Sequence, residues 1–255
     1  MNYIIAADTD IGIKKSTNQD ALSVKKFRTN TGNMVFAVLC DGMGGLSKGE
    51  LASSEVIRAF NEWLANEFSG RCSTQEDFEL IKSQWTRVID NENRKIGSYG
   101  RQMAIHLGTT VVAMLLTDNG YLAMNVGDSR AYEIGEGLVQ ITKDQSVVAQ
   151  EIEMGKLTEE EALKDSRRNV LLQCVGASET VVPAFYQGET KSNHVYMLCS
   201  DGFVHEIRRE EIYAWLSPMA SVDKNSMAAN IRNLIELNKS RYEQDNISVV
   251  AVKTF

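Results

Sequence analysis

The chain has 255 residues, of which 43% are hydrophobic and 24% charged, a composition typical of a globular protein that can bury a sizeable core. It carries 27 Lys and Arg against 34 Asp and Glu, a net charge of −7 without a basic cluster, and we therefore expect neither nucleic acid nor a membrane as a partner. No apolar run approaches the roughly 18 residues of a membrane span, no secretory leader is visible, and the four cysteines lack C-x-x-C spacing, which predicts a cytoplasmic protein with reduced thiols.

The first half of the chain alternates the patterns of strands and helices. Residues 34–40, MVFAVLC, are a continuous apolar run typical of a buried strand, and DGMGG follows them. Apolar residues at helical spacing predict a helix over 49–68, with one face made by Leu51, Val56, Ile57, Phe60, Trp63, Leu64 and Phe68. A second helix is predicted over 73–96, where Ser73 and Glu76 have the spacing of a capping box.

The middle of the chain has the pattern of consecutive β-hairpins. Residues 109–117 and 121–127 flank an Asp-Asn-Gly turn, and 129–142 repeats the pattern around a glycine-rich turn, which predicts an antiparallel meander. The chain continues with short helical pieces in 143–170, a strand at 194–200, a helix at 226–240 and a strand at 247–255. Helices and antiparallel strands without strict alternation predict an α+β fold layered on both sheet faces, and no linker divides residues 1–255 into more than one domain.

Five aspartates lie at the ends of predicted strands on five separate segments: Asp20, Asp41, Asp128, Asp201 and Asp245. Carboxylates and backbone carbonyls are the protein oxygens that Mg²⁺ and Mn²⁺ prefer, and strand ends hold them rigidly. A glycine after Asp41 and another after Asp201 leave the backbone carbonyl open to an ion. The plainer interpretation is that each Asp-Gly pair only forms a tight turn, as such pairs often do between strands.

The segments around these aspartates resemble, in order and over nearly the whole chain, the motifs of the metal-dependent serine/threonine protein phosphatases, the PPM family in its bacterial form. The resemblance rests on TDIGIKKSTNQDAL (9–22), CDGMGG (40–45), GTT (108–110), VGDSRAY (126–132), TKDQS (142–146), RRNVLLQCVG (167–176), LCSDG (198–202) and DNISVV (245–250). It implies a four-layer α-β-β-α sandwich, in which two antiparallel β-sheets are flanked by helices, with two metal ions in a cleft at one end.

The resemblance also implies the ligands of a pair of Mn²⁺ or Mg²⁺ ions. Asp41 would bridge both ions, and the Gly42 carbonyl would complete the coordination of one. Asp201 and Asp245 would hold the other ion. Asp128 matches a ligand of the weaker third metal seen in many members of the family.

Further residues match or depart from the family pattern near these ligands. Asp20 would position metal-bound water. Lys15 stands where the family usually has an arginine that grips the substrate phosphate, with Lys14 as an adjacent candidate; because an ammonium is one mobile charge rather than a planar fork, we expect looser phosphate binding. Gln19 replaces a common glutamate and brings no charge to the second metal. His205 replaces an aspartate ligand of the third metal, so that site is expected to be weak, absent or selective for Mn²⁺; the histidine itself is either a general acid or, more simply, an ordinary surface residue.

The expected activity is hydrolysis of phosphoserine and phosphothreonine in proteins by a water that bridges the two metals. We expect a monomer that acts on phosphorylated proteins and opposes a serine/threonine kinase. The alternative is a catalytically weak or inactive PPM-fold regulatory or binding module, and a narrow signalling phosphatase with one protein substrate is a third interpretation. In the flap, Asp165 and Ser166 stand where His-Pro is frequent, and Gln145 stands where histidine is usual, so substrate specificity does not follow from the family.

Overall fold

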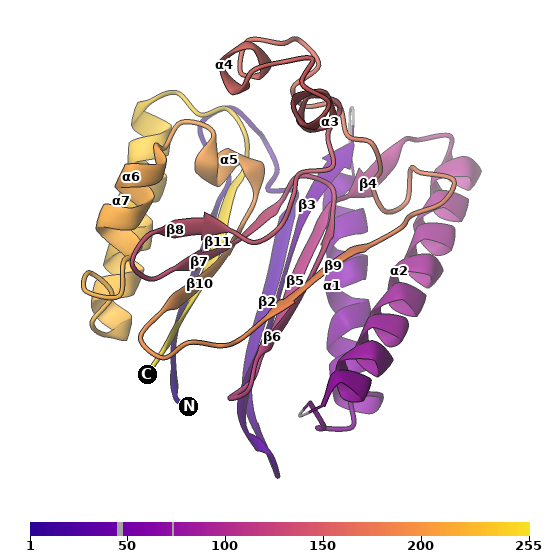
Figure 1. Cartoon of the computed structure of the whole chain (residues 1–255). Coiled ribbons are helices and arrows are strands. Elements are labelled where there is room, and N and C mark those ends of the chain that lie inside the picture. The colour runs from indigo at the N-terminus through magenta and orange to yellow at the C-terminus, as the bar shows by residue number, and fades with distance from the viewer. Residues whose placement is uncertain (45–47, 73) are drawn as a thin grey trace.

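The computed structural model describes residues 1–44, 48–72 and 74–255. Two antiparallel β-sheets pack face to face, and helices cover the outer face of each sheet (Figure 1). Apolar side chains fill all three interfaces between the four layers, and their burial is the main contribution to stability. The predicted α-β-β-α sandwich is confirmed.

One sheet places strands from both ends of the chain side by side. Its order is β1-β11-β10-β7-β8, and the bounds in that order are Tyr3–Asp10, Ile247–Thr254, Val195–Cys199, Arg130–Ile134 and Leu138–Gln140. β1 and β11 pair along their whole length, from Tyr3↔Thr254 to Asp10↔Ile247. The outer face of this sheet is covered by α5 (Asp201–Val204), α6 (Arg209–Leu216) and α7 (Lys224–Ser240).

The other sheet has the order β2-β3-β5-β6-β9, and β4 pairs with the far end of β3. The bounds of β2 to β6 and β9 are Asp20–Thr29, Gly32–Gly44, Leu107–Thr109, Val111–Leu116, Tyr121–Val126 and Ala184–Gly188. Two long helices, α1 (Gly49–Asn66) and α2 (Gln75–Met103), cover its outer face. β2 is an edge strand, since no described strand pairs with it on the side away from β3.

Aromatic rings anchor the two long helices to this sheet. Phe60 and Trp63 of α1 meet Trp85 of α2 above Phe36 of β3, and each of the four side chains is at most 1% exposed. Buried rings in such edge-to-face and tilted contacts contribute both apolar area and specific geometry. The predicted face of the first helix is therefore confirmed in its centre, but Leu51 is 39% exposed and does not belong to it.

The second helix begins at a capping box one residue later than predicted. The Asp77 N–H donates to Thr74 Oγ1 over 3.2 Å, and the Thr74 N–H donates to the Asp77 carboxylate over 3.0 Å. The predicted cap, Ser73, lies outside the described residues. The helix continues past residue 96 to Met103 and ends where Ala104 adopts the left-handed conformation.

The continuous meander predicted over 109–142 is wrong. The β5–β6 hairpin belongs to one sheet and the β7–β8 hairpin to the other. The chain crosses between the sheets at 127–129, where Gly127 has a φ of +97° and a Cβ would lie 2.7 Å from Thr110 Cγ2. The pattern of a hairpin does not specify which sheet it joins, and this crossing carries Asp128.

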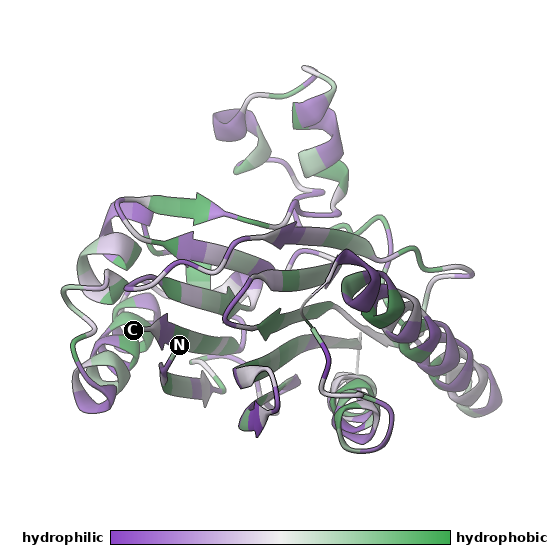
Figure 2. Ribbon diagram, turned by 60° about the horizontal axis from the view of Figure 1, so that its bottom comes forward, coloured by the Kyte–Doolittle hydropathy of each residue, from purple (hydrophilic) through white to green (hydrophobic). Residues whose placement is uncertain are grey.

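The segment after β8 projects from one end of the sandwich (Figures 1 and 2). It holds α3 (Val147–Glu153) and α4 (Glu159–Ala162), which are the short helical pieces predicted for 143–170. Thr158 and Glu161 form the predicted capping box of α4. Hydrophobic colour follows the strands in Figure 2, whereas this projecting segment, the flap, is mixed.

The remaining bulk expectations concern cysteines and membrane spans. All four cysteines are free and buried: Cys40, Cys72, Cys174 and Cys199. Burial raises the pKa of the Cys72 and Cys199 thiols to about 12, so both stay protonated and unreactive at neutral pH. Within the described ranges no helix is long and apolar enough to cross a membrane.

Candidate metal centre

Asp20 and Asp41 lie directly opposite each other in the β2–β3 pairing. Asp20 opens β2, as predicted, but Asp41 lies inside β3 rather than at its end. The strand continues to Gly44 because β4 pairs with it there, through Gly42↔Thr109 and Gly44↔Leu107. Asp41 is thus held on both sides by neighbouring strands.

The GTT motif fixes the backbone of Asp41. The Asp41 N–H donates to Thr110 Oγ1 over 3.0 Å, and the Thr110 N–H and Thr109 Oγ1 donate to the Asp41 carbonyl, each over 2.9 Å. Thr110 Oγ1 also lies 2.6 Å from Ser129 Oγ at the crossing between the sheets. With its backbone groups satisfied in this way, Asp41 has only its carboxylate to offer to a ligand.

Gly42 is needed because three backbone segments meet around it. A Cβ at Gly42 would lie 2.3 Å from the Gly49 carbonyl oxygen and 2.5 Å from that of Gln19. The Gly42 N–H donates to the Gln19 carbonyl over 3.1 Å. The start of α1 and the segment before Asp20 therefore close directly onto the backbone next to Asp41.

Asp201 and Asp245 reach the same end of the sandwich from the other sheet. Asp201 opens α5 directly after β10, and Asp245 lies two residues before β11. A Cβ at Gly202 would lie 2.2 Å from the Asn246 carbonyl oxygen, so only glycine allows the two segments this close. The order β10-β11 in the sheet is what places these two aspartates side by side.

Asn246 ties the N-terminal loop to this pair of segments. Its Oδ1 accepts a hydrogen bond from the Gln19 N–H over 2.9 Å, and its Nδ2 donates to the carbonyls of Ile11 and Thr17 over 2.9 and 3.3 Å. Asn246 is 2% exposed. This side chain was not singled out from the sequence, although the motif DNISVV contains it, and it orients the loop that carries Lys15.

The electrostatics of Asp20 and Asp41 indicate a site built for positive charge. Loss of hydration, together with the charges of Asp201 and Asp245, raises the pKa of the Asp20 carboxyl to about 7. Loss of hydration also raises the pKa of Asp41 well above its usual value, and the Asp20, Asp201 and Asp245 carboxylates add to the shift. Carboxylates that repel one another in this way need a cation nearby to remain ionised at neutral pH.

Several of these carboxylate oxygens have no partner of their own. Both oxygens of Asp20 and Oδ1 of Asp201 are buried without a hydrogen-bond partner among the described residues. The Ser200 and Ser248 hydroxyls lower the pKa of Asp20, but neither has the geometry of a hydrogen bond to it. Ser200 Oγ instead accepts from the Ser248 N–H, and Ser248 Oγ contacts Thr9 Oγ1. Unpartnered acidic oxygens beside a bare carbonyl fit a hard divalent cation.

The number of carboxylates per ion is small. Among residues 1–44, 48–72 and 74–255, no three His, Cys, Asp or Glu side chains are grouped so as to hold one ion by themselves. Mg²⁺ typically takes one or two protein carboxylates and completes its shell with water and other oxygens. The donor set of Asp41, Asp201, Asp245 and the Gly42 carbonyl fits that chemistry, with water supplying the remaining positions.

Asp128 is held near the same carboxylates by the crossing between the sheets. Loss of hydration raises its pKa to about 8, and Asp201 is the largest charge that adds to the shift. Gln145 fixes the crossing, because its Oε1 accepts from the Gly127 N–H over 2.9 Å and its own N–H donates to the Gly127 carbonyl over 2.9 Å. Gln145 therefore has a structural role at the base of the flap, which its position in the motif did not reveal.

Lys15 forms an ion pair with one of the candidate ligands. Its Nζ lies 2.9 Å from Asp245 Oδ1, and both side chains are about one third exposed, at 38% and 32%. Burial lowers the pKa of Lys15, but the hydrogen bond to Asp245 and the charges of Asp245, Asp41 and Asp201 outweigh it and raise the pKa. Lys14 instead donates to Gln244 Oε1 over 2.7 Å. Of the two lysines, Lys15 is the one that points at the acidic centre.

His205 is a surface residue whose imidazole lies between two acidic side chains. Its Nε2 lies 3.4 Å from Asp201 Oδ2 and its Nδ1 lies 3.4 Å from Glu243 Oε2. Burial alone lowers the pKa of His205, but Glu243, Asp201 and Asp128 raise it to about 9. His205 is exposed, as the simpler interpretation expects, and a role as general acid stays a prediction. Glu243, which is 6% exposed and was not singled out from the sequence, also accepts hydrogen bonds from the N–H groups of Gln244 and Asp245 over 2.7 and 2.8 Å.

Comparison with known proteins gives consistent matches along the chain. Residues 13–236 match the family described as protein phosphatase 2C. A putative protein phosphatase 2C-type protein of Streptococcus pyogenes is 30% identical over 251 residues, which cover 97% of this chain and 96% of that protein. The solved serine/threonine phosphatase of S. agalactiae has a TM-score of 0.85 at 27% identity, with all of both chains covered. The catalytic domain of the serine/threonine protein phosphatase PstP, solved in complex with two manganese ions, has a TM-score of 0.76 at 26% identity, with 99% of each chain covered.

Proposed function

Because the chain belongs to the protein phosphatase 2C family, whose members are metal-dependent serine/threonine phosphatases, we propose that its acidic centre is the catalytic site. The observation that carries this proposal is the set of buried, unpartnered oxygens of Asp20 and Asp201 beside Asp41. We propose that residues 1–255 act as one catalytic domain and that the metal ligands are Asp41, Gly42, Asp201 and Asp245.

The cofactor we propose is a pair of Mn²⁺ or Mg²⁺ ions. Such a pair supplies a nucleophile from water at neutral pH and neutralises charge on the transferring phosphoryl group. One proposed ligand, Asp41, belongs to one sheet, whereas Asp201 and Asp245 follow or precede strands of the other. The packing of the two sheets therefore sets the distance between the two halves of the site. Asp20, opposite Asp41, accepts a proton from the attacking water and orients it, since both of its oxygens are free to do so.

Lys15 is proposed to bind the substrate phosphate. It is exposed enough to meet a substrate and it lies at the edge of the acidic centre. A lysine ammonium lacks the planar fork with which an arginine contacts two groups at once. Contact with a phosphate oxygen must therefore weaken the ion pair between Lys15 and Asp245. This competition supports the expectation of loose substrate binding.

A third metal, if it binds, would use Asp128. His205 stands where the family has an aspartate ligand of that metal, with its Nε2 3.4 Å from Asp201 Oδ2, and an imidazole is a poor ligand for Mg²⁺. We therefore propose that the third site is weak. A second role for His205, donation of a proton to the leaving serine or threonine oxygen, is favoured by its pairing with Glu243, whose carboxylate stabilises the imidazolium form while solvent water returns the proton.

Serine/threonine phosphatases act on phosphorylated proteins, and we propose that this chain acts as a monomer that opposes a serine/threonine kinase. The chain keeps Asp41, Gly42, Asp201 and Asp245, which supports this proposal over that of a non-catalytic binding module. Gln145, at the base of the flap, forms a hydrogen bond with Gly127 in the crossing that carries Asp128. This position next to the acidic centre supports a role for the flap in selecting phosphoprotein substrates. A cytoplasmic location is part of the same proposal.

The direct test is hydrolysis of p-nitrophenyl phosphate with Mn²⁺, with Mg²⁺ and with EDTA. The expected result is turnover with either metal and none with EDTA. Asp201→Ala should lower kcat/KM by about 10²-fold or more, since it removes a ligand from the centre. Asp90→Ala, which removes an exposed carboxylate on α2, is the matched control and should retain full activity. Turnover in EDTA, or none in any condition, would overturn the proposal.

A further inference from the structure

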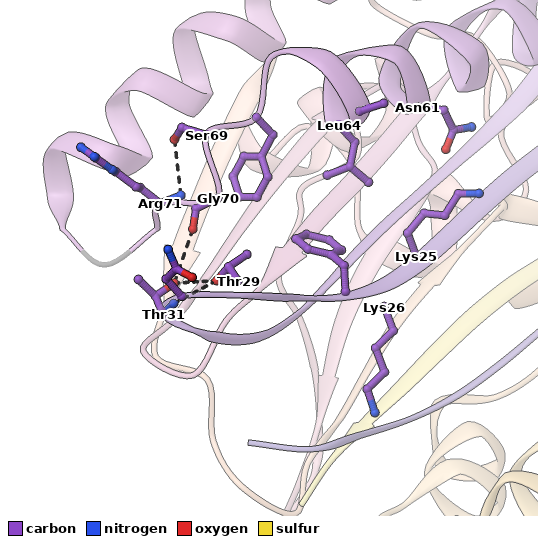
Figure 3. Close-up of a pocket in the computed structure, with 13 residues that line it drawn as sticks. Lys25, Lys26, Thr29, Thr31, Asn61, Leu64, Ser69, Gly70 and Arg71 are labelled. Atoms are coloured by element: carbon purple, nitrogen blue, oxygen red, sulfur yellow. Dashed lines mark hydrogen bonds between the residues drawn. The ribbon is translucent and has the colours of Figure 1, made fainter.

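A groove lies along the half of β2 that is farther from the acidic centre. Its volume is about 860 Å³, and it is enclosed by the end of β2 with the turn that follows, by the last turns of α1, and by the loop at 68–71 (Figure 3). None of the five strand-associated aspartates lines it. The groove is therefore separate from the proposed catalytic site.

The floor of the groove is apolar. Phe27 of β2 and Phe68 of the loop contact each other edge to face, with ring centroids 5.8 Å apart. Leu64 of α1 lies beside them, and all three side chains are partly exposed while packing against the core between the sheet and its helices. Partly exposed rings above a rigid core are the kind of surface on which an apolar side chain of another chain can dock.

The rim of the groove is positively charged. Lys25 and Arg71 line it, both are exposed, and no Asp or Glu is among the lining residues, whereas the Lys26 side chain points away from the groove (Figure 3). Lys26 donates to the Tyr3 carbonyl over 3.3 Å, whereas neither Lys25 nor Arg71 has an ion pair within the part of the chain that the structure describes. On a chain with a net charge of −7, two cations around one groove that has no Asp or Glu in its lining favour an acidic occupant.

The strand that forms one wall is an edge strand. No described strand pairs with the outer side of β2, so its backbone groups on that side are open to another extended chain. β2 also begins at Asp20, and Lys25 follows five residues later, about 17 Å along a strand that rises roughly 3.4 Å per residue. One extended polypeptide could therefore lie on the groove while a residue further along it reaches the acidic centre.

We propose that this groove docks an extended acidic segment, with one aromatic or large apolar anchor, of the phosphoprotein substrate. The anchor packs on Phe27 and Phe68, the acidic residues pair with Lys25 and Arg71, and the backbone runs along the open edge of β2. The link to substrate rests on the proposed phosphatase activity, whereas docking of the segment itself does not. Lysines on an edge strand also prevent edge-to-edge association of sheets, which is the competing explanation.

The binding test uses a fluorescein-labelled peptide of twelve residues, which is rich in glutamate and has one central phenylalanine. Fluorescence anisotropy with the full chain in EDTA measures its affinity without metal. Lys25→Glu combined with Arg71→Glu should weaken binding by about tenfold or more, as expected for reversal of two contacting charges. The matched control combines Lys224→Glu with Arg94→Glu, which makes the same change in net charge on exposed residues of α7 and α2 and should leave binding unchanged.

A peptide that carries phosphoserine beyond the acidic segment links docking to catalysis. Its kcat/KM should fall in the groove variant by a similar factor, about tenfold, while turnover of p-nitrophenyl phosphate stays the same. Absence of p-nitrophenyl phosphate turnover in the unmodified chain would overturn the phosphatase proposal, not the docking. The docking proposal is overturned if the peptide fails to bind, if both double variants lose binding equally, if single-stranded DNA competes as well as the peptide, or if the groove variant aggregates without any change in binding.

Discussion

At the scale of single residues, the centre combines oxygens that lack partners with a lysine that already has one. Asp20 has two buried oxygens without a hydrogen-bond partner in the part of the chain that the structure describes, whereas Lys15 Nζ lies 2.9 Å from Asp245 Oδ1. The first arrangement is costly until a cation arrives, because a buried unsatisfied polar group costs about 1–3 kcal/mol. The second makes phosphate binding compete with an existing ion pair.

Replacing Lys15 by arginine tests that competition. A guanidinium can contact Asp245 with one edge and a phosphate with another, since it offers five N–H donors in a fixed plane. Lys15→Arg is expected to lower KM for p-nitrophenyl phosphate a few-fold with little change in kcat. Lys15→Met should raise KM, and steady-state kinetics in Mn²⁺ measures both. A KM that is the same for Lys, Arg and Met at this position would exclude a role in phosphate binding.

Replacing Asp20 by asparagine separates stability from function. The substitution removes a charge where no partner compensates it, so the metal-free protein should gain about 1–2 kcal/mol, or roughly 2–8 °C in Tm. Activity with Mn²⁺ should fall, because the side chain can no longer accept a proton from water. Differential scanning calorimetry in EDTA and kinetics in Mn²⁺ measure the two effects. A less stable metal-free variant would contradict this account of Asp20.

At the scale of elements, the two long helices depend on one aromatic cluster. Trp85 of α2 is fully buried against Phe36, Phe60 and Trp63, yet its indole N–H has no hydrogen-bond partner among the described residues. Its packing and its polar atom therefore have opposite effects on stability.

Two substitutions separate these effects. Trp85→Ala should destabilise the fold by about 3–5 kcal/mol, since it leaves a large cavity under both helices. Trp85→Phe keeps a ring and removes the unpartnered N–H, so its cost should be much smaller, about 1 kcal/mol or less. Urea unfolding gives both values. A Trp85→Phe variant as unstable as Trp85→Ala would show that the N–H has a partner after all.

The helices on the other face are tied by a partly buried ionic contact that predicts a pH dependence. Glu211 of α6 accepts two hydrogen bonds of 2.7 Å from Arg241, which caps α7, and one of 3.0 Å from Arg208. The side-chain hydrogen bonds from Arg241 and Arg208 lower the pKa of Glu211. A carboxyl whose pKa is lower in the folded state stabilises that state above its unfolded pKa and loses the effect as pH falls.

The matching experiment compares Tm for the unmodified chain and Glu211→Gln at two pH values. At pH 7 the variant should melt slightly lower, because both arginines lose a charged partner. At pH 3 the difference should shrink, since the unfolded state already gains a proton below about pH 4.5 while the folded state holds the carboxylate. A difference that is constant between pH 7 and pH 3 would show that the contact is not ionic.

At the scale of the whole molecule, the elements with clear periodicity could be predicted and their partners could not. The helices at 49–66 and 224–240 and the strand at 34–40 followed from local pattern, because their buried faces repeat at the period of the element. β1 was not predicted from the sequence, because its residues, YIIAADTD, do not alternate regularly between buried and exposed positions. The hairpins were predicted, but their assignment to two different sheets depends on contacts that a hairpin does not encode.

The same limit applies to the candidate site. The aspartates could be selected from strand-end motifs and from resemblance, because each is marked by its neighbours in sequence. The contacts that adjust them join residues far apart: Lys15 with Asp245, His205 with Glu243, and Asn246 with the carbonyls of Ile11 and Thr17. No spacing in the sequence indicates such pairs, so the engaged state of Lys15 and the role of Glu243 required the folded chain.

The position of β11 inside its sheet sets a time at which the enzyme can first act. A ribosome makes residues 245–254 after every other element described here, yet β11 lies between β1 and β10, and Asp245 immediately precedes it. A growing chain that stops short of these residues lacks both the strand that joins β1 to β10 and one of the proposed metal ligands, Asp245. Elements made early can fold in order of synthesis, but this sheet closes only through contacts of very long sequence separation. We therefore expect a nascent chain to lack phosphatase activity until β11 has been made and has joined the sheet.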